Sequence, residues 1–220
     1  VAGGSRALEQ RLHRVDLRGQ LQLGPVKAQL GPLLGRRQVV VHEVVDLGAG
    51  DEACVHGGVH GNFGLSNAHI VRELLAQGYI VAAPEYRGST GYGKKFQREI
   101  DYGGKEIDDT KYTRDYMVQN YDFVDKNRIG VMGWSHGGMH TLMNLFQFPD
   151  SYAVGFAGVP VSDLIMRLGY MNEEYRKLFS AEYHIGKEVF QNVKEYRKRS
   201  PVWNVEKLKT KKMAKALVLA

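Results

Sequence analysis

Hydrophobic positions from residue 66 onward alternate between helical and strand periodicity. Apolar residues recur at helical spacing over 70–75, where Ser66 or Asn67 can cap the helix and Gly78 ends it. A short apolar run at 79–83 then predicts a strand that Pro84 stops. Further along lie a helix over about 105–121, a buried strand over 128–132, an apolar helix over 139–148 and a buried strand over 153–159. This order predicts an α/β fold with a mostly parallel sheet flanked by helices.

Two regions flank this alternating pattern. In residues 1–54 we expect an atypical N-terminal extension, in which 39–45 is a plausible strand and 48–53 reads as a poor one. The domain itself is expected to cover 55–220. Within it, residues 163–200 are helical in pattern and polar, which suggests an excursion above the sheet before a strand at 216–219.

A glycine-flanked serine lies between the predicted strand at 128–132 and the helix that follows it. Residues 133–137 read G-W-S-H-G and fit the G-x-S-x-G motif of serine nucleophiles. Such a turn is tight, so Gly133 and Gly137 are expected where a Cβ would collide. The helix N-terminus favours the oxyanion formed when Ser135 attacks a carbonyl, and His136 is expected to donate its backbone N–H. The His136 imidazole reads as a lining group; a chance glycine-rich turn is the alternative.

Several segments together resemble the prolyl oligopeptidase family of serine peptidases and esterases. The nucleophile segment 125–138 carries the resemblance, supported by H-G-G at 56–58, Y-R-G-S-T-G-Y-G at 86–93, V-P-V-S-D at 159–163 and S-P at 200–201. The resemblance covers about residues 55–210. It implies an α/β-hydrolase catalytic domain, with Ser135 as nucleophile and Gly58 as the second oxyanion N–H donor beside His136.

The resemblance also places the acid and the histidine base after the S-P region, on loops that follow later strands. The chain ends before these loops, so we expect a partial domain whose C-terminal strands are missing. Asp163 and His184 occur in the required order and are an internal alternative pair. However, Asp163 reads better as a helix N-cap, and His184 as an ordinary residue on a polar helix. The family also carries a propeller domain, which the first sixty residues are too short to encode: either the propeller is absent, which favours a small ester or short peptide as substrate, or the chain is a piece of a longer protein.

Composition narrows the choice of partners. The net charge of +6 is concentrated at residues 197–215, which contain eight basic residues and one acidic residue. Without a nucleic-acid-binding motif this segment favours a solvated face over a nucleic-acid partner. No stretch is apolar enough to span a membrane, and Cys54 cannot form an internal disulfide. His56 and His60 lack companion ligands, so no metal or other cofactor is implied.

We therefore predict a serine hydrolase that acts on a small peptide or an ester, located by default in the cytoplasm. Homo-oligomerisation stays open. The alternative is a catalytically incomplete hydrolase-like domain that acts in protein–protein association, pairing through a sheet edge at 216–219.

Overall fold

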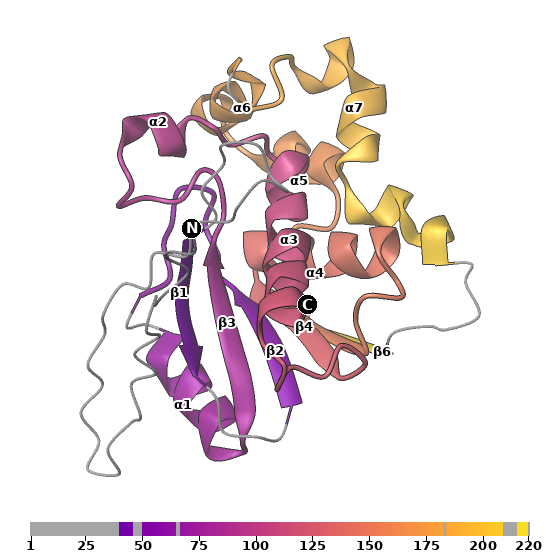
Figure 1. Ribbon diagram of the computed structural model, residues 1–220. Coiled ribbons are helices and arrows are strands. Elements are labelled where there is room, and N and C mark those ends of the chain that lie inside the picture. The colour runs from indigo at the N-terminus through magenta and orange to yellow at the C-terminus, as the bar shows by residue number, and fades with distance from the viewer. Residues whose placement is uncertain (1–39, 46–49, 65–66, 183, 209–214, 220) are drawn as a thin grey trace, which may run out of the picture.

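The computed structural model describes residues 40–45, 50–64, 67–182, 184–208 and 215–219. Its elements form one sheet with helices on both faces (Figure 1). The strands are β1 (Val40–Val45), β2 (Gly50–Val55), β3 (Tyr79–Glu85), β4 (Ile129–Trp134), β5 (Val154–Gly158) and β6 (Lys215–Leu219). The longer helices are α1 (Ala68–Ala76), α3 (Lys105–Asn120) and α4 (His136–Gln147). The predicted alternation of helix and strand is confirmed.

The six strands are ordered β1-β3-β2-β4-β5-β6. β1 runs antiparallel to β3, and all other neighbouring pairs are parallel. Parallel strands bring their carboxyl ends to the same edge of the sheet, where ligands bind in open α/β folds. The loops that follow β2, β3, β4 and β5 therefore meet at one edge, and this edge holds the predicted site.

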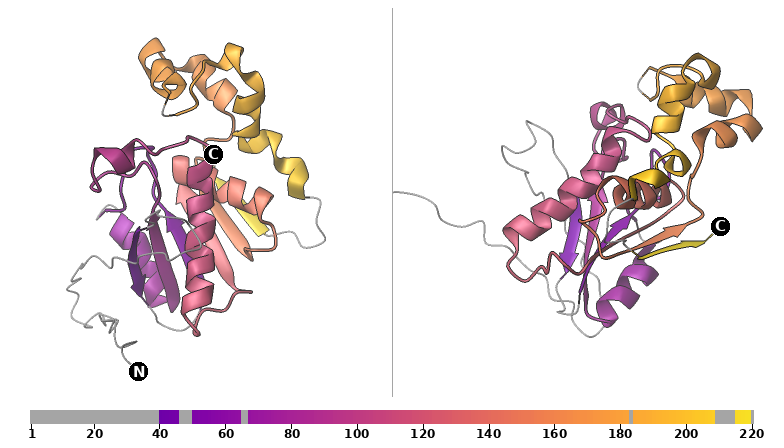
Figure 2. Two further views of the ribbon diagram at one scale, coloured as in Figure 1. Left: turned by 45° about the horizontal axis from the view of Figure 1, so that its top comes forward. Right: turned by 90° about the vertical axis from the view of Figure 1, so that its right-hand side faces the viewer.

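Successive side chains of a strand point to opposite faces, and this alternation divides the core. Val131 of β4 packs on the side of α3 and α4, together with Leu142 and Leu145 of α4. Its neighbour Met132 packs on the opposite side, against Val71 and other residues of α1 and the strands. Figure 2 shows the sheet between these helices. Burial on both faces explains why β3 and β4 read as continuous apolar runs.

The excursion after β5 folds into short helices above this edge of the sheet (Figure 1). They are α5 (Leu164–Tyr170), α6 (Glu173–Ser180), α7 (Val193–Lys198) and the 3₁₀ helices η3 (Val189–Gln191), η4 (Pro201–Trp203) and η5 (Val205–Leu208). A separate apolar cluster joins them to the sheet layer, in which Leu164, Phe179 and Tyr196 contact Tyr102 and Met139. A further short helix, α2 (Lys94–Gln97), lies in the glycine-rich loop after β3.

Three expectations from the sequence were wrong in detail. Residues 48–53 were expected to be a poor strand, but β2 begins at Gly50 and pairs with β3 and β4 near the middle of the sheet. Neighbours on both sides supply the pairing that local propensity does not favour. The sheet thus includes residues before position 55, and the exact domain boundary stays a prediction because residues 1–39 lie outside the described part of the chain.

The second error concerns Pro84, which was expected to end β3. The strand continues to Glu85, with Pro84 opposite Val41 of β1. The parallel pairing with β2 reaches only Ala82, so the missing N–H of Pro84 removes no bond from that ladder. The third error concerns His184, which lies in a buried turn after α6 and not on a polar helix.

Candidate active site

Ser135 lies at the sharp turn between β4 and α4. Its backbone has φ 55° and ψ −112°, a conformation that side chains larger than glycine rarely adopt. Hydrogen bonds hold the turn on both sides: the Ser135 N–H donates to the Gly158 carbonyl at 2.9 Å, and the Ser135 carbonyl accepts from Met139 at 3.1 Å. The residue is half-buried. The strand-to-helix turn expected from the motif is therefore present, with the serine in a strained backbone conformation.

The two motif glycines explain how the chain can turn so tightly. A Cβ on Gly133 would lie 2.5 Å from the carbonyl carbon and oxygen of Gly137. A Cβ on Gly137 would collide with the carbonyl oxygen of Val55, at the end of β2. Both clashes are with backbone atoms, which cannot rotate away as a side chain can. The motif glycines thus let strand, helix and neighbouring strand approach one another closely.

The H-G-G segment follows β2 and lies directly against this turn. A Cβ on Gly57 would lie 3.0 Å from the Trp134 carbonyl oxygen and 3.6 Å from Cβ of Ser135. Gly58 is exposed and has φ +79°, a left-handed conformation that suits glycine. The structure therefore brings Gly58 to the same edge of the sheet as Ser135 and His136, from which it is far apart in sequence.

Tyr86, at the end of β3, connects the H-G-G segment to α4. Its hydroxyl donates to the Gly58 carbonyl at 2.9 Å and lies 3.0 Å from Nδ1 of His136. The same oxygen lies 3.2 Å from Nδ1 of His56, whose ring stacks on the Tyr86 ring at 4.2 Å. Tyr86 is fully buried, and burial raises the pKa of its hydroxyl well above the ordinary value. It is therefore a neutral phenol that bridges both segments expected to supply oxyanion donors.

His56 is fixed at the base of the same loop. Its Nε2 atom lies 2.9 Å from the Ser89 hydroxyl and 3.3 Å from Oε2 of Glu85. His60 lies apart from His56 in its contacts: its Nδ1 atom is 2.9 Å from the Gly88 carbonyl, and its ring contacts His184. These contacts hold the loop in place, and each of the two histidines makes them with different partners.

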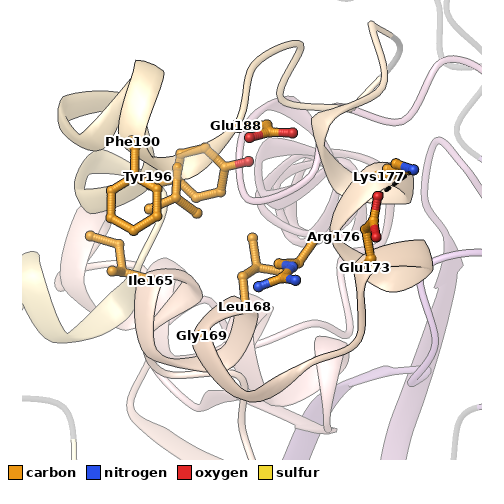
Figure 3. Close-up of a pocket in the computed structure, with 10 residues that line it drawn as sticks. Ile165, Leu168, Gly169, Glu173, Arg176, Lys177, Glu188, Phe190 and Tyr196 are labelled. Atoms are coloured by element: carbon orange, nitrogen blue, oxygen red, sulfur yellow. Dashed lines mark ion pairs between the residues drawn. The ribbon is translucent and has the colours of Figure 1, made fainter.

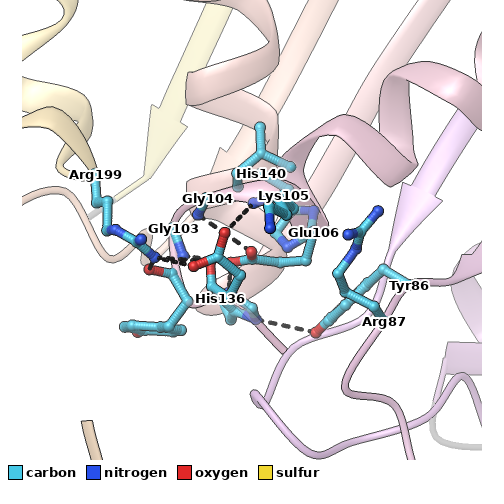
Figure 4. A network of polar contacts seen from close by, with 12 residues as sticks. Tyr86, Arg87, Gly103, Gly104, Lys105, Glu106, His136, His140 and Arg199 are labelled. Carbon is cyan, nitrogen blue, oxygen red and sulfur yellow. Dashed lines mark hydrogen bonds and ion pairs between the residues drawn. The ribbon is translucent and has the colours of Figure 1, made fainter. Parts of the chain in front are cut away.

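The His136 imidazole is buried beneath the turn. Its Nε2 atom lies 3.3 Å from Oε1 of Glu106 on α3, and burial lowers the pKa of the ring to about 3. Glu106 also accepts hydrogen bonds from the backbone N–H groups of Gly103 and Gly104 (Figure 4). Burial raises the pKa of Glu106 to about 8. At neutral pH the His136 ring is therefore neutral and buried inside the protein. These are the surroundings of a side chain with a structural role.

The internal alternative pair, Asp163 and His184, makes contacts of other kinds. The Asp163 carboxylate caps α5, accepting hydrogen bonds from the N–H groups of Ile165 at 2.8 Å and Met166 at 3.2 Å. This agrees with its interpretation as an N-cap. The His184 ring packs against Phe179 at 5.4 Å and Tyr102 at 6.2 Å. Nothing in these contacts joins the two side chains into an acid–base pair.

A pocket of about 390 Å³ lies among α5, α6, η3 and α7 (Figure 3). Its wall combines the apolar side chains of Ile165, Leu168 and Phe190 with the charged side chains of Arg176 and Glu188. Ser135 is not among the residues that line it. The pocket therefore belongs to the helical excursion and not to the expected nucleophile.

Sequence reasoning missed three buried residues around the site. Tyr86 was noted only as part of a motif, and Glu106 and His140 were not noted at all. Asp109, on the same helix as Glu106, is also buried and accepts from the Arg87 backbone N–H at 2.9 Å and side-chain Nε at 2.7 Å. A fully buried carboxylate on an amphipathic helix leaves no signal in hydrophobic periodicity, because its position is scored as polar.

With this geometry established, comparison with known proteins defines the class. A family model described as the prolyl oligopeptidase family matches residues 66–220. The chain belongs to this family.

Its relatives include dipeptidyl peptidase 8 from Mus musculus, 42% identical over 91 residues, which cover 40% of this chain and 10% of that protein. The uncharacterized peptidase YuxL of Bacillus subtilis (strain 168) is 30% identical over 150 residues, covering 67% of this chain and 22% of the relative. The chain thus spans about a tenth to a fifth of the length of these two relatives.

Solved structures show the same fold. A puromycin hydrolase superposes with a TM-score of 0.71 at 23% identity, covering 83% of this chain and 28% of that one. The acylaminoacyl peptidase of Pyrococcus horikoshii superposes with a TM-score of 0.67 at 24% identity, covering 82% of this chain and 28% of the other. The predicted α/β-hydrolase fold, with a mostly parallel sheet flanked by helices, is confirmed. Among the described segments, every helix is too short or too polar to cross a bilayer.

Proposed function

We propose that this chain carries the nucleophile of a serine hydrolase that cleaves a peptide or ester bond through an acyl-enzyme on Ser135. The observation that carries the proposal is the backbone of Ser135, held at φ 55° between a parallel strand and the N-terminus of a helix. Strain of this kind persists only where the surrounding structure imposes it, and it clusters at functional sites. Membership of a peptidase family and the printed names of the relatives support the same reaction class.

In the proposed reaction the Ser135 hydroxyl oxygen attacks the carbonyl carbon of the substrate. The hydroxyl proton passes to a histidine base, and the carbonyl π electrons move to oxygen, which becomes an oxyanion. Return of that electron pair expels the amine or alcohol, which takes the proton from the base. Water then attacks the acyl-enzyme by the same route and releases the acid and the serine hydroxyl.

The backbone N–H groups of His136 and Gly58 are proposed to stabilise the oxyanion. The His136 N–H is in the first turn of α4, where helical N–H groups have no partner within the helix. Two contacts support Gly58: its neighbour Gly57 closely approaches the Trp134 carbonyl, and the Tyr86 hydroxyl donates to the Gly58 carbonyl. We assign Tyr86 as a positioning residue for both donors. Losing one oxyanion donor outright typically lowers kcat by about 10²–10³-fold, so their placement matters.

The proposed reaction also needs a base that takes the proton from the Ser135 hydroxyl. A serine needs a base within about 2.6–3.2 Å, whose tautomer a third group fixes. The His136 ring faces Glu106 and Tyr86 and has a lowered pKa, so it is not assigned this role.

We propose a small peptide or an ester as the substrate class and the cytoplasm as the location.

The test is covalent labelling by a fluorophosphonate probe, applied to the full-length protein that contains this chain. Labelling should fall on Ser135, disappear in Ser135→Ala, and persist in Ser180→Ala, a half-buried serine on α6. Labelling that persists in Ser135→Ala, or a folded protein that is not labelled, would contradict the proposal. In that second case a concentration-dependent dimer in light scattering would favour the association role, and a monomer would exclude that role as well.

A further inference from the structure

Three buried side chains from two helices meet beneath the Ser135 turn. Glu106 is on α3, and His136 and His140 are one helical turn apart on α4. One potential ligand atom from each residue lies within 4.8 Å of the other two, and all three residues are at most 1% exposed. Figure 4 shows these side chains in one network. The donor set is one carboxylate oxygen and two imidazole nitrogens.

The Nδ1 atom of each imidazole already has a hydroxyl partner. Nδ1 of His136 lies 3.0 Å from the Tyr86 hydroxyl, and Nδ1 of His140 lies 2.9 Å from the Thr110 hydroxyl. Metal-bound histidines have this arrangement, because a hydrogen bond to the outer nitrogen fixes the tautomer and the ring orientation. With the Nδ1 atoms engaged, the Nε2 atoms are available for a ligand.

Of the two Nε2 atoms, the described residues satisfy only one. Nε2 of His136 faces Oε1 of Glu106 at 3.3 Å, a distance at which one shared proton can serve both atoms. Among the described residues, Nε2 of His140 is buried and has no hydrogen-bond partner. A buried polar atom without a partner costs about 1–3 kcal/mol. A proton between Glu106 and His136 therefore leaves the third member of the cluster unmatched, whereas a cation would match all three.

From this arrangement we propose that Glu106, His136 and His140 form a binding site for a divalent transition-metal ion of the Zn²⁺ class. Imidazole nitrogens with one carboxylate oxygen suit Zn²⁺ and its neighbours, and two histidines at positions i and i+4 of a helix present their rings to one ion. Burial lowers the pKa of both rings, so they are in the neutral form that binds metals. With metal–ligand distances of about 2.0–2.2 Å, tetrahedral ligand atoms lie about 3.3–3.6 Å apart. Oε1 of Glu106 and Nε2 of His136, at 3.3 Å, already have this separation.

The ion would be structural, since it would link α3 to α4 below the turn without touching a substrate. It would hold the first turn of α4, and with it the His136 backbone, against the helix that carries Glu106. The proposal concerns binding only, so it stands or falls separately from the hydrolase activity proposed above.

Metal retention tests the proposal directly. The protein is unfolded with a chelator, refolded in the presence of Zn²⁺ because the site is buried, desalted and analysed for zinc. We expect one ion per chain for the wild type and for His69→Gln, a control that removes an exposed histidine from α1. His140→Gln and Glu106→Gln should bind at least about 100-fold more weakly. Refolding with Co²⁺ should give the visible absorption of a low-coordinate site, which these two variants lose.

A graded variant keeps the test informative if a ligand substitution impairs folding. Thr110→Val preserves side-chain shape and removes only the hydroxyl that holds His140, so we expect about 10-fold weaker binding, as for other residues that orient a ligand. Far-UV circular dichroism checks that each protein is folded. Folded wild type without zinc, or zinc retained equally by His140→Gln, would overturn the proposal and leave a proton as the only occupant of the cluster.

Discussion

The backbone strain at Ser135 can be measured by comparing two substitutions at that position. Ser135→Ala removes the hydroxyl but keeps a Cβ at φ 55° and ψ −112°. Ser135→Gly removes the Cβ as well. These dihedral angles are those of the first central residue in a type II′ turn, a position that glycine dominates. The difference between the two variants therefore reports the cost of a side chain in this conformation.

The expected magnitude follows from two opposing contributions. A non-glycine residue in a sparsely populated backbone region costs about 1–3 kcal/mol. Glycine loses more conformational entropy on folding than alanine, which costs about 0.5–1 kcal/mol. The strain relieved at Ser135 is the larger of the two over most of these ranges, so Ser135→Gly should be more stable than Ser135→Ala by about 0–2.5 kcal/mol, centred near 1 kcal/mol. Both variants lack the nucleophile, so activity does not enter the comparison.

Equilibrium unfolding in urea is the assay, with the midpoint compared at an unchanged slope. The same pair of substitutions at Arg72, an exposed position in the middle of α1, is the control: there Arg72→Gly should be less stable than Arg72→Ala by about 1 kcal/mol. The preference thus reverses between the two sites. A Ser135→Gly variant less stable than Ser135→Ala by the amount seen at residue 72 would refute the strain and, with it, the assignment of this turn as a functional one.

Further predictions concern the contacts around the turn. Gly137→Ala should lower the free energy of unfolding by about 1–3 kcal/mol or more in the same urea assay, because its Cβ meets the Val55 carbonyl, whereas Gly169→Ala, with open space around the new Cβ, should not. Tyr86→Phe should cost about 1–3 kcal/mol by leaving the Gly58 carbonyl and His136 without their partner; equal stability with the exposed Tyr170→Phe would contradict this. Burial lowers the pKa of His184 to about 4, so between pH 6.5 and 4 the unfolded chain binds a proton that the folded chain does not. The free energy of unfolding should therefore decrease as the pH is lowered through this range. His184→Gln should make that fall shallower in unfolding curves measured across this range, and an unchanged slope would exclude the effect.

Parts of the fold that depend on local pattern were predicted closely. The expected helix over about 105–121 is α3, Lys105–Asn120, and the expected strand at 39–45 is β1, Val40–Val45. The errors arose where neighbours override local preference. The segment Gly50–Val55 has weak strand propensity, but β3 and β4 on its two sides give it a complete hydrogen-bond ladder.

The candidate site divides in the same way. The G-x-S-x-G motif located the Ser135 turn because its requirements are local: two missing Cβ atoms and a strand that runs into a helix. The Tyr86 bridge joins residues separated by 28 and 50 positions, and no spacing rule indicates that these groups meet. This bridge could be found only once the order of the strands in the sheet was known.

By itself, therefore, the sequence determined an α/β fold with a mostly parallel sheet and the position of the strained serine, because both follow from periodicity and from steric limits within a few residues; the α/β-hydrolase class came from the resemblance of its motifs to those of a known family. The tertiary structure alone decided which buried polar groups surround that serine. Glu106, His136 and His140 come together only because α3 and α4 pack on the same face of the sheet. Their partners are set by packing across the core, where a polar atom must find whatever group the fold places within hydrogen-bond distance.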